Sequence, residues 1–533
     1  MSRTNISQED ASSSDEEQIV SSREREGKVI TCILMGITIL FIGSNIVLPT
    51  SNMHLIEIIT GLKLVKQMPV FFKACYIGYI LGCIFGGVGF DYFELPKEKL
   101  MMLSFMLIVM TLTTGCVPFC SNAFGLGVNF FVNGICIQFC MTGILAYCFG
   151  LFGKKCNICV QFLFFLFSLG KVVTISVSSV GYSEFDHLVN YTTTDHLKSD
   201  ASQKLITSHT LMACLIALAF VAWFCLYRFS PSQFMLKVPF DDSRNLSTGP
   251  GLFVFGIISS MPLVFFASLV EGSYPIMISK FANDRLSTDI DVKRDVLALF
   301  WGCFVLGRFV AVGLAYKCCT SPQFIVLNLG LLLCSGCLLA LTSDEEESIL
   351  WIATAFLGLS GASLLPSTYV WLHQHIYVNS KVIGVLSIIS IISLISSTFG
   401  IHNSFSKNPK APLYCILLSP TLYAIAFAIQ AIVFKQIEHP TPRRRESHAE
   451  AAGSHSSTAI PRCLTPKNIL RKEIHDSGQC RNVISDMGTL KSSAQKQNQR
   501  TVNLLRSLEF PAESVIQTNH TKSLIERRNS DEF

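Results

Sequence analysis

The stretch LFVFGIISSMPLVFFASLVEGSYPIMI, residues 252–278, is longer than the ~20 apolar residues that a helix needs to cross a bilayer. It carries one charged side chain, Glu271. A carboxylate at the centre of a membrane helix costs about 2.5–3.5 kcal/mol on the insertion scale, so apolar packing alone does not account for it. The stretch therefore predicts a spanning helix with a functional acidic side chain.

The composition of the whole chain is typical of a helical membrane protein. Of its 533 residues, 50% are hydrophobic and 15% are charged, whereas a soluble domain has about 25% charged residues. The net charge of +5 forms no basic face with aromatic side chains, so we expect no nucleic-acid partner. HExxH, GxSxG and phosphate-loop motifs are absent, so we expect no enzyme. Most of the 20 cysteines lie in apolar runs and predict packing, with no metal site.

Apolar runs of spanning length recur along residues 29–434 and predict twelve transmembrane helices, which are the lipid-embedded part of the chain. The expected spans are 29–48, 69–90, 100–119, 123–149, 156–180, 210–226, 252–278, 296–315, 324–341, 349–376, 382–399 and 413–434. A longer polar connection separates the sixth span from the seventh. We therefore predict an all-α membrane protein with two six-helix halves, residues 29–228 and 251–437, joined by a cytosolic linker, residues 229–250.

Basic residues beside the spans predict the orientation of the chain. An even number of spans places both termini on one side, and Lys and Arg favour the cytosol. Arg23, Arg25 and Lys28 precede the first span, which makes residues 1–28 a cytosolic tail. The sequon at Asn190 then lies outside and predicts a glycoprotein that takes the secretory route. The plasma membrane is the expected location.

The C-terminal segment, residues 438–533, is rich in Ser, Lys, Arg and Gln and has no sustained apolar period. That composition predicts a disordered cytosolic tail. Such a tail could hold cytosolic partners, which leaves open a membrane sensor or adaptor that does not transport.

Three charged residues fall inside the predicted spans: Glu271, Arg308 and Lys171. Ionisable groups within the membrane usually face the bundle interior and mark a pathway or a binding site. The alternative is an ion pair that only locks helices together. Two cations and one anion leave one positive charge for a ligand, a backbone carbonyl or a proton.

Uncharged polar groups inside the spans suit a polyhydroxylated neutral solute. Gly272, Pro275 and Pro262 also predict an interrupted seventh span around Glu271, and interrupted helices border cavities. Amide side chains offer donors and acceptors, and an indole offers a flat apolar face with one donor. These candidates for substrate contact are Asn45, Asn129, Asn133, Gln138, Gln161 and Trp301. For each of them, a hydrogen bond between helices is the alternative.

Several stretches, in this order, resemble the major facilitator superfamily, in particular its sodium-dependent glucose transporter branch, which is related to fucose permease. They are IGSNIVLPTSNMHLI (42–56), YIGYILGCIFGGVGFD (76–91), QFLFFLFSLGKVV (161–173), LVEGSYPI (269–276) and LFWGCFVLGR (299–308). Within the second stretch, Gly87 and Asp91 match the start of the superfamily loop motif. The resemblance implies a secondary transporter that moves a glucose-like hexose by alternating access, with no bound cofactor and with Na⁺ as candidate coupling ion.

The chain departs from that branch at several positions, of which the acidic position on the fourth helix is linked to ion coupling. The fourth span of the branch carries an acidic residue followed by Asn, where this sequence has Val132 and Cys136. Lys171 replaces a small residue, and Tyr92 replaces the basic residue of the loop motif. Among these departures, the missing acidic residue on the fourth span argues against coupling to Na⁺ or protons. They leave open a carrier of another solute, such as an organic anion drawn by Lys171 and Arg308.

Overall fold

The computed structural model of the protein describes most of the membrane part of the chain. Its described backbone covers residues 6–60, 64–93, 95–120, 122–153, 156–189, 194–229, 250–285, 290–317, 319–341, 347–401 and 411–438. The predicted disordered tail, most of the predicted linker and the sequon at Asn190 lie outside these residues. The statements about them, and the adaptor alternative that depends on the tail, therefore stay predictions.

The described backbone is helical and contains no strand. In chain order the first half contains α1 (Ile6–Ser51), α2 (Met53–Thr60), α3 (Leu64–Tyr92), α4 (Pro96–Cys116), the short 3₁₀ turn η1 (Val117–Phe119), α5 (Ala123–Phe152), α6 (Asn157–Val189) and α7 (Thr194–Phe229). The second half contains α9 (Pro250–Arg285), α10 (Ile290–Lys317), α11 (Ser321–Leu341), α12 (Glu347–Gly361), α13 (Leu364–His375), α14 (Ser380–Ile395), the π-helical segment η3 (Ser396–Ile401) and α16 (Ala411–Glu438).

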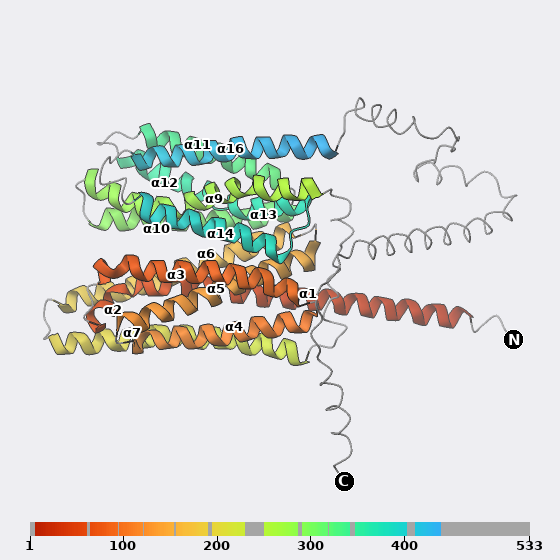
Figure 1. The fold of residues 1–533 in the computed structure, drawn as a ribbon, viewed down its shortest axis with the longest axis horizontal. Helices are drawn as coiled ribbons and strands as arrows, with labels where there is room; N and C mark the ends of the chain where they lie inside the picture. The colour runs from red at the N-terminus through yellow and green to blue at the C-terminus, as the bar shows by residue number, and fades with distance from the viewer. Residues whose placement is uncertain are drawn as a thin grey trace, which may run out of the picture. The chain divides into compact units, whose positions relative to one another are not determined.

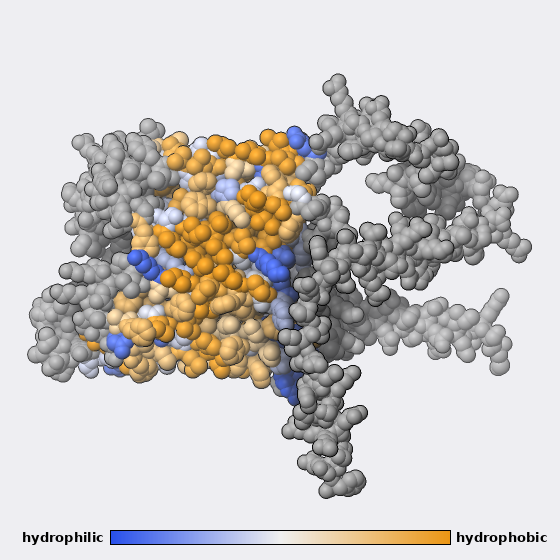
Figure 2. Space-filling view, in the orientation of Figure 1, coloured by the Kyte–Doolittle hydropathy of each residue, from blue (hydrophilic) through white to orange (hydrophobic). Residues whose placement is uncertain are grey.

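The twelve predicted spans are confirmed one for one among the described residues. Twelve segments are long and apolar enough to cross a membrane, from Glu26–Ser51 to Ile416–Gln436. Large apolar side chains on their outer faces are exposed, as are Leu112, Leu218 and Phe309. Figure 2 shows an apolar surface over the helical part of the molecule. Such a surface suits contact with lipid, and the chain is a multi-pass membrane protein.

The helices form two groups that lie side by side, α1 to α7 and α9 to α16 (Figure 1). Each group repeats the same set of contacts. In the first half α3 packs on α5, α1 on α6 and α4 on α7; in the second half α10 packs on α12, α9 on α14 and α11 on α16. The helix pairs α3–α14 and α6–α10 join the halves. Two six-helix halves are therefore present as predicted.

Glycines allow close helix contacts at equivalent places in the two halves. A Cβ on Gly82 would lie 2.5 Å from the carbonyl oxygen of Ile135 on α5. A Cβ on Gly307 would lie at the same 2.5 Å from the carbonyl oxygen of Leu359 on α12. Only glycine permits such an approach of backbone to backbone. In the sequence, Gly82 with Gly86 and Gly307 with Ala311 place small residues four apart in the second helix of each half, which alone is weak evidence for a repeat. The equal contacts of Gly82 and Gly307 turn that spacing into a structural correspondence.

The predicted interruption lies in a different helix from the one that the prolines indicated. Helix α9 continues from Pro250 to Arg285 through Pro262 and Pro275, so the prediction of a broken seventh span is wrong. Neighbouring helices and side chains compensate for proline inside membrane helices. The tenth span is the interrupted one, because α12 ends at Gly361 and α13 begins at Leu364. The break frees carbonyl groups within the bundle.

The halves meet firmly at the end of the bundle that contains Asp91. Gly87 on α3 faces the start of α14, where a Cβ would lie 3.2 Å from the carbonyl oxygen of Ser380. The backbone N–H of Ser380 donates to Asp91 Oδ1 at 3.2 Å. The loop-motif residues Gly87 and Asp91 therefore lie at the contact between the halves. A carboxylate at this place also stabilises the N-terminus of α14.

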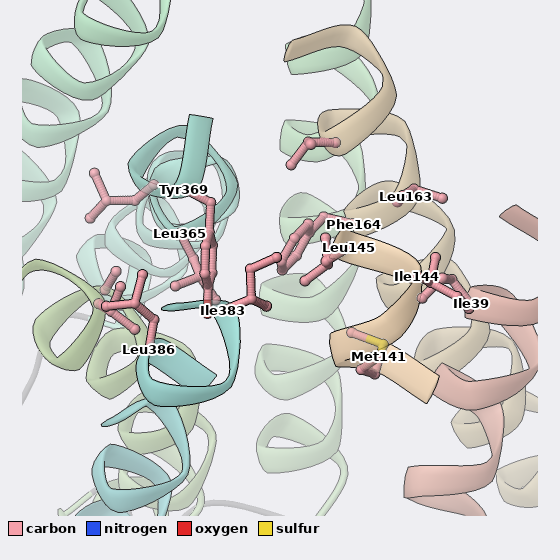
Figure 3. Close-up of a cluster of buried hydrophobic side chains, with 14 of the residues drawn as sticks. Ile39, Met141, Ile144, Leu145, Leu163, Phe164, Leu365, Tyr369, Ile383 and Leu386 are labelled. Atoms are coloured by element: carbon pink, nitrogen blue, oxygen red, sulfur yellow. The ribbon is translucent and has the colours of Figure 1, made fainter. Parts of the chain in front are cut away.

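Next to this contact, toward the middle of the bundle, a cluster of buried apolar side chains fills the space between the halves. Phe164, Leu145 and Met141 come from the first half, and Leu365 and Tyr369 come from the second (Figure 3). The rings of Phe164 and Tyr369 have centroids 6.3 Å apart. This cluster separates the Asp91 end from the space beyond it.

Candidate functional site

A cavity of about 390 Å³ lies between the two halves, on the far side of that apolar cluster. Met141, Leu145, Phe164, Leu365 and Tyr369 form part of its lining. The lining continues to the helix ends opposite Asp91, where it includes Thr50, Phe72, Ile175, Pro275 and Thr398. Cavities of ~300–1,000 Å³ are the usual size for small-molecule sites. The cavity is mostly apolar, with a few polar groups that converge on it.

Glu271, Lys171 and Arg308 form one ion-pair network at the wall of this cavity. Lys171 Nζ on α6 lies 2.9 Å from Glu271 Oε1, and Arg308 Nη2 on α10 lies 3.2 Å from Glu271 Oε2. Each cation thus takes one carboxylate oxygen. Both cations therefore pair with the same anion, and the formal charge of the trio remains positive. The side chains of Lys171 and Glu271 are 14% and 12% exposed.

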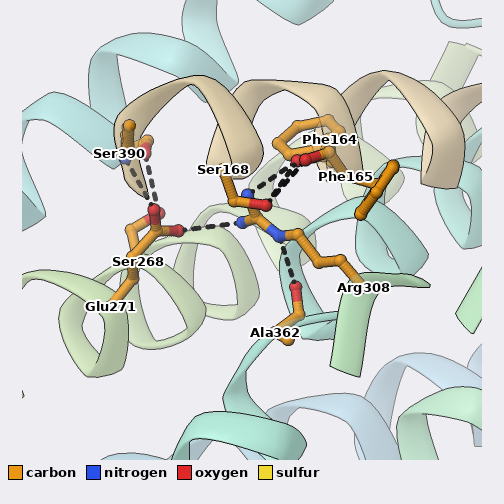
Figure 4. A network of polar contacts seen from close by, with 9 residues as sticks. Phe164, Phe165, Ser168, Ser268, Glu271, Arg308, Ala362 and Ser390 are labelled. Carbon is orange, nitrogen blue, oxygen red and sulfur yellow. Dashed lines mark hydrogen bonds and ion pairs between the residues drawn. The ribbon is translucent and has the colours of Figure 1, made fainter. Parts of the chain in front are cut away.

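Arg308 is held from three sides and is buried beneath the cavity lining. Its Nε donates to the carbonyl oxygen of Ala362 at 3.0 Å, and its Nη1 donates to that of Phe164 at 2.9 Å (Figure 4). Ala362 lies in the break between α12 and α13, and Pro366, four residues later, has no N–H to donate to its carbonyl. The planar guanidinium matches three acceptors in fixed directions. Arg308 therefore positions Glu271 and ties α10 to α6 across the halves.

The predicted polar residues divide into those that line the cavity and those that do not. Asn45, Asn133, Gln138, Lys171, Glu271 and Trp301 line it. Asn129 and Gln161 do not. Asn129 Nδ2 lies 3.8 Å from Cys120 Sγ, and Gln161 Nε2 donates to Ser367 Oγ at 3.0 Å. Gln161 and the buried Arg308 thus contact other helices, whereas Asn129 contacts Cys120, the residue that follows η1.

Asn45 and Asn133 combine a place in the lining with hydrogen bonds among helices. Asn45 Nδ2 donates to Asn133 Oδ1 at 3.2 Å. The hydroxyls of Thr114 and Thr113 on α4 donate to Asn45 Oδ1 at 3.1 Å and Asn133 Oδ1 at 3.3 Å. This network links α1, α4 and α5. It fixes one wall of the cavity with neutral groups.

The wall formed by the second half contains hydroxyl groups that sequence reasoning missed. Ser268 Oγ and Ser390 Oγ lie 2.7 Å apart, and Ser387 and Ser397 also line the cavity. Tyr76 OH and Thr398 Oγ1 lie 3.0 Å apart across the halves. The signal was present, since Ser387, Ser390 and Ser397 recur at helical spacing and so share one face of the eleventh span.

Curated relatives of the chain are transporters. No protein-family model matches it. It is 23% identical over 333 residues to human "Sodium-dependent glucose transporter 1", covering 60% of this chain and 62% of that protein. It is 22% identical over 386 residues to mouse "Sodium-dependent glucose transporter 1A", covering 68% of this chain and 88% of that protein. The chain thus matches less than two thirds of the human protein's length. The predicted resemblance to this transporter branch is confirmed.

Solved structures with the same fold are also transporters. The fucose:proton symporter FucP of E. coli, in its outward conformation, has a TM-score of 0.61 at 12% identity, with 76% of this chain and 99% of that chain covered. The proton:xylose symporter XylE has a TM-score of 0.57 at 11% identity, with 76% and 95% covered. The chain therefore has the fold of the major facilitator superfamily.

Proposed function

We propose that the protein is a secondary transporter that binds a glucose-like hexose in the cavity between its halves. The observation that carries the proposal is the position of Glu271, which reaches the cavity from α9 while Arg308 and Lys171 hold both its oxygens. The relatives named glucose transporters and the fold shared with two sugar symporters point in the same direction.

The lining offers what a sugar requires. Glu271 and Gln138 present oxygen acceptors, and Gln138 also presents amide donors. Trp301 presents a flat apolar face beside them. A hexose has hydroxyl groups around its edge and C–H groups on its faces, so a cavity with a few polar groups among aromatic side chains complements it.

Alternating access follows from the way the halves meet. The cavity extends to the helix ends opposite Asp91, while Gly87, Asp91 and the apolar cluster close the other end. With the predicted cytosolic termini, this arrangement is open toward the outside. Rocking of one half against the other about the cavity would separate α3 from α14 at the Asp91 end and bring the outer ends together. The plasma membrane is the proposed location.

Uptake of radiolabelled glucose into cells that express the protein tests the proposal with a matched pair of variants. Gln138→Leu and Asn129→Leu replace amides on the same helix, but only Gln138 lines the cavity. We expect Gln138→Leu to reduce uptake at least tenfold and Asn129→Leu to leave it within about twofold of the wild type, at equal surface delivery. Equal uptake by the two variants would contradict a site in this cavity.

A small organic anion is a second candidate substrate, favoured by the excess positive charge of the Lys171–Glu271–Arg308 network. The same cells distinguish the two candidates by competition. Unlabelled glucose should suppress the signal, whereas a small carboxylate such as lactate should not. Uptake of labelled lactate that glucose does not suppress would assign the cavity to anions.

A further inference from the structure

Lys171 holds a positive charge in the wall of the cavity. Its Nζ lies 2.9 Å from Glu271 Oε1 and 4.4 Å from the centroid of the Phe167 ring, with Trp301 at 5.8 Å. Lys171 and Glu271 both line the cavity, and Glu271 is the one carboxylate among its described lining residues. The Lys171 ammonium therefore contacts the carboxylate to which a cation entering the cavity would bind.

A coupling Na⁺ does not fit this arrangement. A hard cation takes oxygen ligands and favours carboxylates among them. Both oxygens of Glu271 are already held by nitrogen donors, one from Lys171 and one from Arg308. A sodium ion at Oε1 would meet the ammonium at close range in a site with little water. The described part of the chain contains no group of three or more His, Cys, Asp or Glu side chains that could hold a metal ion.

The oxygen groups beside the ammonium would suit a cation if Lys171 were absent. Ser268 lies one turn before Glu271 on α9, so the two share a helix face. Ser268 Oγ and Ser390 Oγ lie 2.7 Å apart, and both line the cavity close to Glu271 (Figure 4). Removal of the lysine ammonium would leave Glu271 Oε1 without its nitrogen donor, with the two hydroxyls in the same cavity lining.

A purely structural role for Lys171 is not required by the packing. Its ion pair joins α6 to α9 across the halves. Arg308 already joins α6 to the second half, because it donates to the carbonyl oxygen of Phe164 while it contacts Glu271 and Ala362. The Lys171–Glu271 ion pair therefore repeats a link between α6 and Glu271 that Arg308 already provides. What Lys171 adds is a positive charge in the cavity wall.

We propose that the Lys171 ammonium is a tethered cation that stands where a coupling Na⁺ would bind at Glu271, so that transport proceeds without Na⁺. The inference rests on the proposed function in one respect, namely that the solute crosses through this cavity. It also states the difference from the relatives whose names carry sodium dependence: here the cation is part of the protein.

Binding of ²²Na⁺ to the purified full-length protein tests the inference without any transport. We expect no saturable binding by the wild type or by Lys171→Arg, which keeps the charge. We expect Lys171→Ser to bind at least tenfold more ²²Na⁺ than the wild type, and Lys171→Ser/Glu271→Gln to lose that binding. A second neutral variant, Lys171→Gln, replaces Lys171→Ser if the serine variant elutes as aggregate.

Two results would overturn the inference. One is saturable ²²Na⁺ binding by the wild type that Glu271→Gln abolishes, which needs no lysine variant. The other is a folded, monodisperse neutral variant that binds no more ²²Na⁺ than the wild type does.

Glucose uptake with Na⁺ and with choline adds a transport measurement. The wild type should take up glucose equally, within about twofold, in both media, while Lys171→Ser should require Na⁺. Sodium-dependent uptake by the wild type would contradict the tethered-cation role and leave the proposed function intact. If no form takes up glucose in either medium, the proposed function fails, and the ²²Na⁺ measurement alone decides the role of Lys171.

Discussion

The two halves of the bundle share a pattern of helix contacts but line the cavity with different chemistry. Gly82 approaches Ile135, and Gly307 approaches Leu359, at the same distance. The residue after the glycine is Cys83 in the first half and Arg308 in the second. The first half supplies the neutral network of Asn45 and Asn133, whereas the second half supplies the carboxylate and the guanidinium.

The difference extends to the backbone opposite each glycine. Gln138 lies three residues after Ile135 on a continuous α5, and Ala362 lies three residues after Leu359 where α12 ends. Arg308 takes the carbonyl of Ala362 that this break frees. One scaffold thus carries a continuous helix with an amide in one half and a broken helix with a buried cation in the other. Among the described hydrogen bonds, this ion-pair network contacts the first half at two places, the Lys171 ammonium and the Phe164 carbonyl oxygen.

Arg308→Met should destabilise the protein more than any other variant considered. The loss of one partner leaves Glu271 and two carbonyls short of donors, which should lower the free energy of unfolding by about 3–5 kcal/mol. Thermal unfolding of the purified protein measures the change. Arg308→Lys keeps the charge without the planar fork and should fall in between. The equivalent Cys83→Ala should cost about 1 kcal/mol; an equal cost for Cys83→Ala and Arg308→Met would contradict this account of the asymmetry.

Gly82→Ala and Gly307→Ala test whether the two halves are equivalent at these two close contacts. Each adds a Cβ that would lie 2.5 Å from a backbone oxygen, so each should destabilise the protein by about 1–3 kcal/mol. Gly127→Ala is the control, because its Cβ position has no neighbour within 4 Å apart from the adjacent residues and the backbone of its own helix. That variant should be neutral or slightly more stable by thermal unfolding. Tolerance of alanine at only one of the two close positions would show that the halves are not equivalent there.

The neutral network of the first half should contribute less than the charged network of the second. A double-mutant cycle with Asn45→Ala and Asn133→Ala should give a coupling energy of about 0.6 kcal/mol, as is usual for hydrogen bonds between membrane helices. Unfolding of the two single variants and the double variant in the same detergent supplies the cycle. A coupling of several kcal/mol would place the Asn pair on a level with the ion-pair network.

Asp91→Asn should have a small effect. Its carboxylate accepts from the backbone N–H of Ser380 at 3.2 Å and lies 3.9 Å from Lys381 Nζ. Loss of its charge at the N-terminus of α14 should cost about 0.3–1 kcal/mol. We expect a slightly lower unfolding midpoint than that of the wild type. The difference between the two proteins should shrink at high salt, because salt screens the charge. No decrease at low salt would remove Asp91 from the contact between the halves.

The fold could be predicted from the amino-acid sequence because the length and apolar content of a spanning helix are local properties of the chain. The spans, the two halves and the intramembrane positions of Glu271, Arg308 and Lys171 followed from runs of apolar residues and from family-like motifs. The close approach of Gly82 and Gly307 was visible only as a spacing. It became evidence for a repeat once both glycines faced the equivalent backbone oxygen.

Pairing across the halves could not be predicted, because it depends on contacts between residues far apart in sequence. Lys171 and Arg308 lie on different halves and take separate oxygens of Glu271. The prolines of α9 suggested a break, yet α9 is continuous, whereas the real break at Ala362 lies four residues before Pro366, which was not singled out. Amides of one type also separated by location, since Gln138 lines the cavity and Gln161 binds Ser367.

The most direct measurement is uptake of radiolabelled glucose into liposomes that contain the purified protein, with Glu271→Gln reconstituted in parallel. The account predicts time-dependent uptake above that of empty liposomes by the wild type, and uptake at background by Glu271→Gln that still elutes as a single folded species. Equal uptake by the wild type and by Glu271→Gln would contradict the central role of this carboxylate.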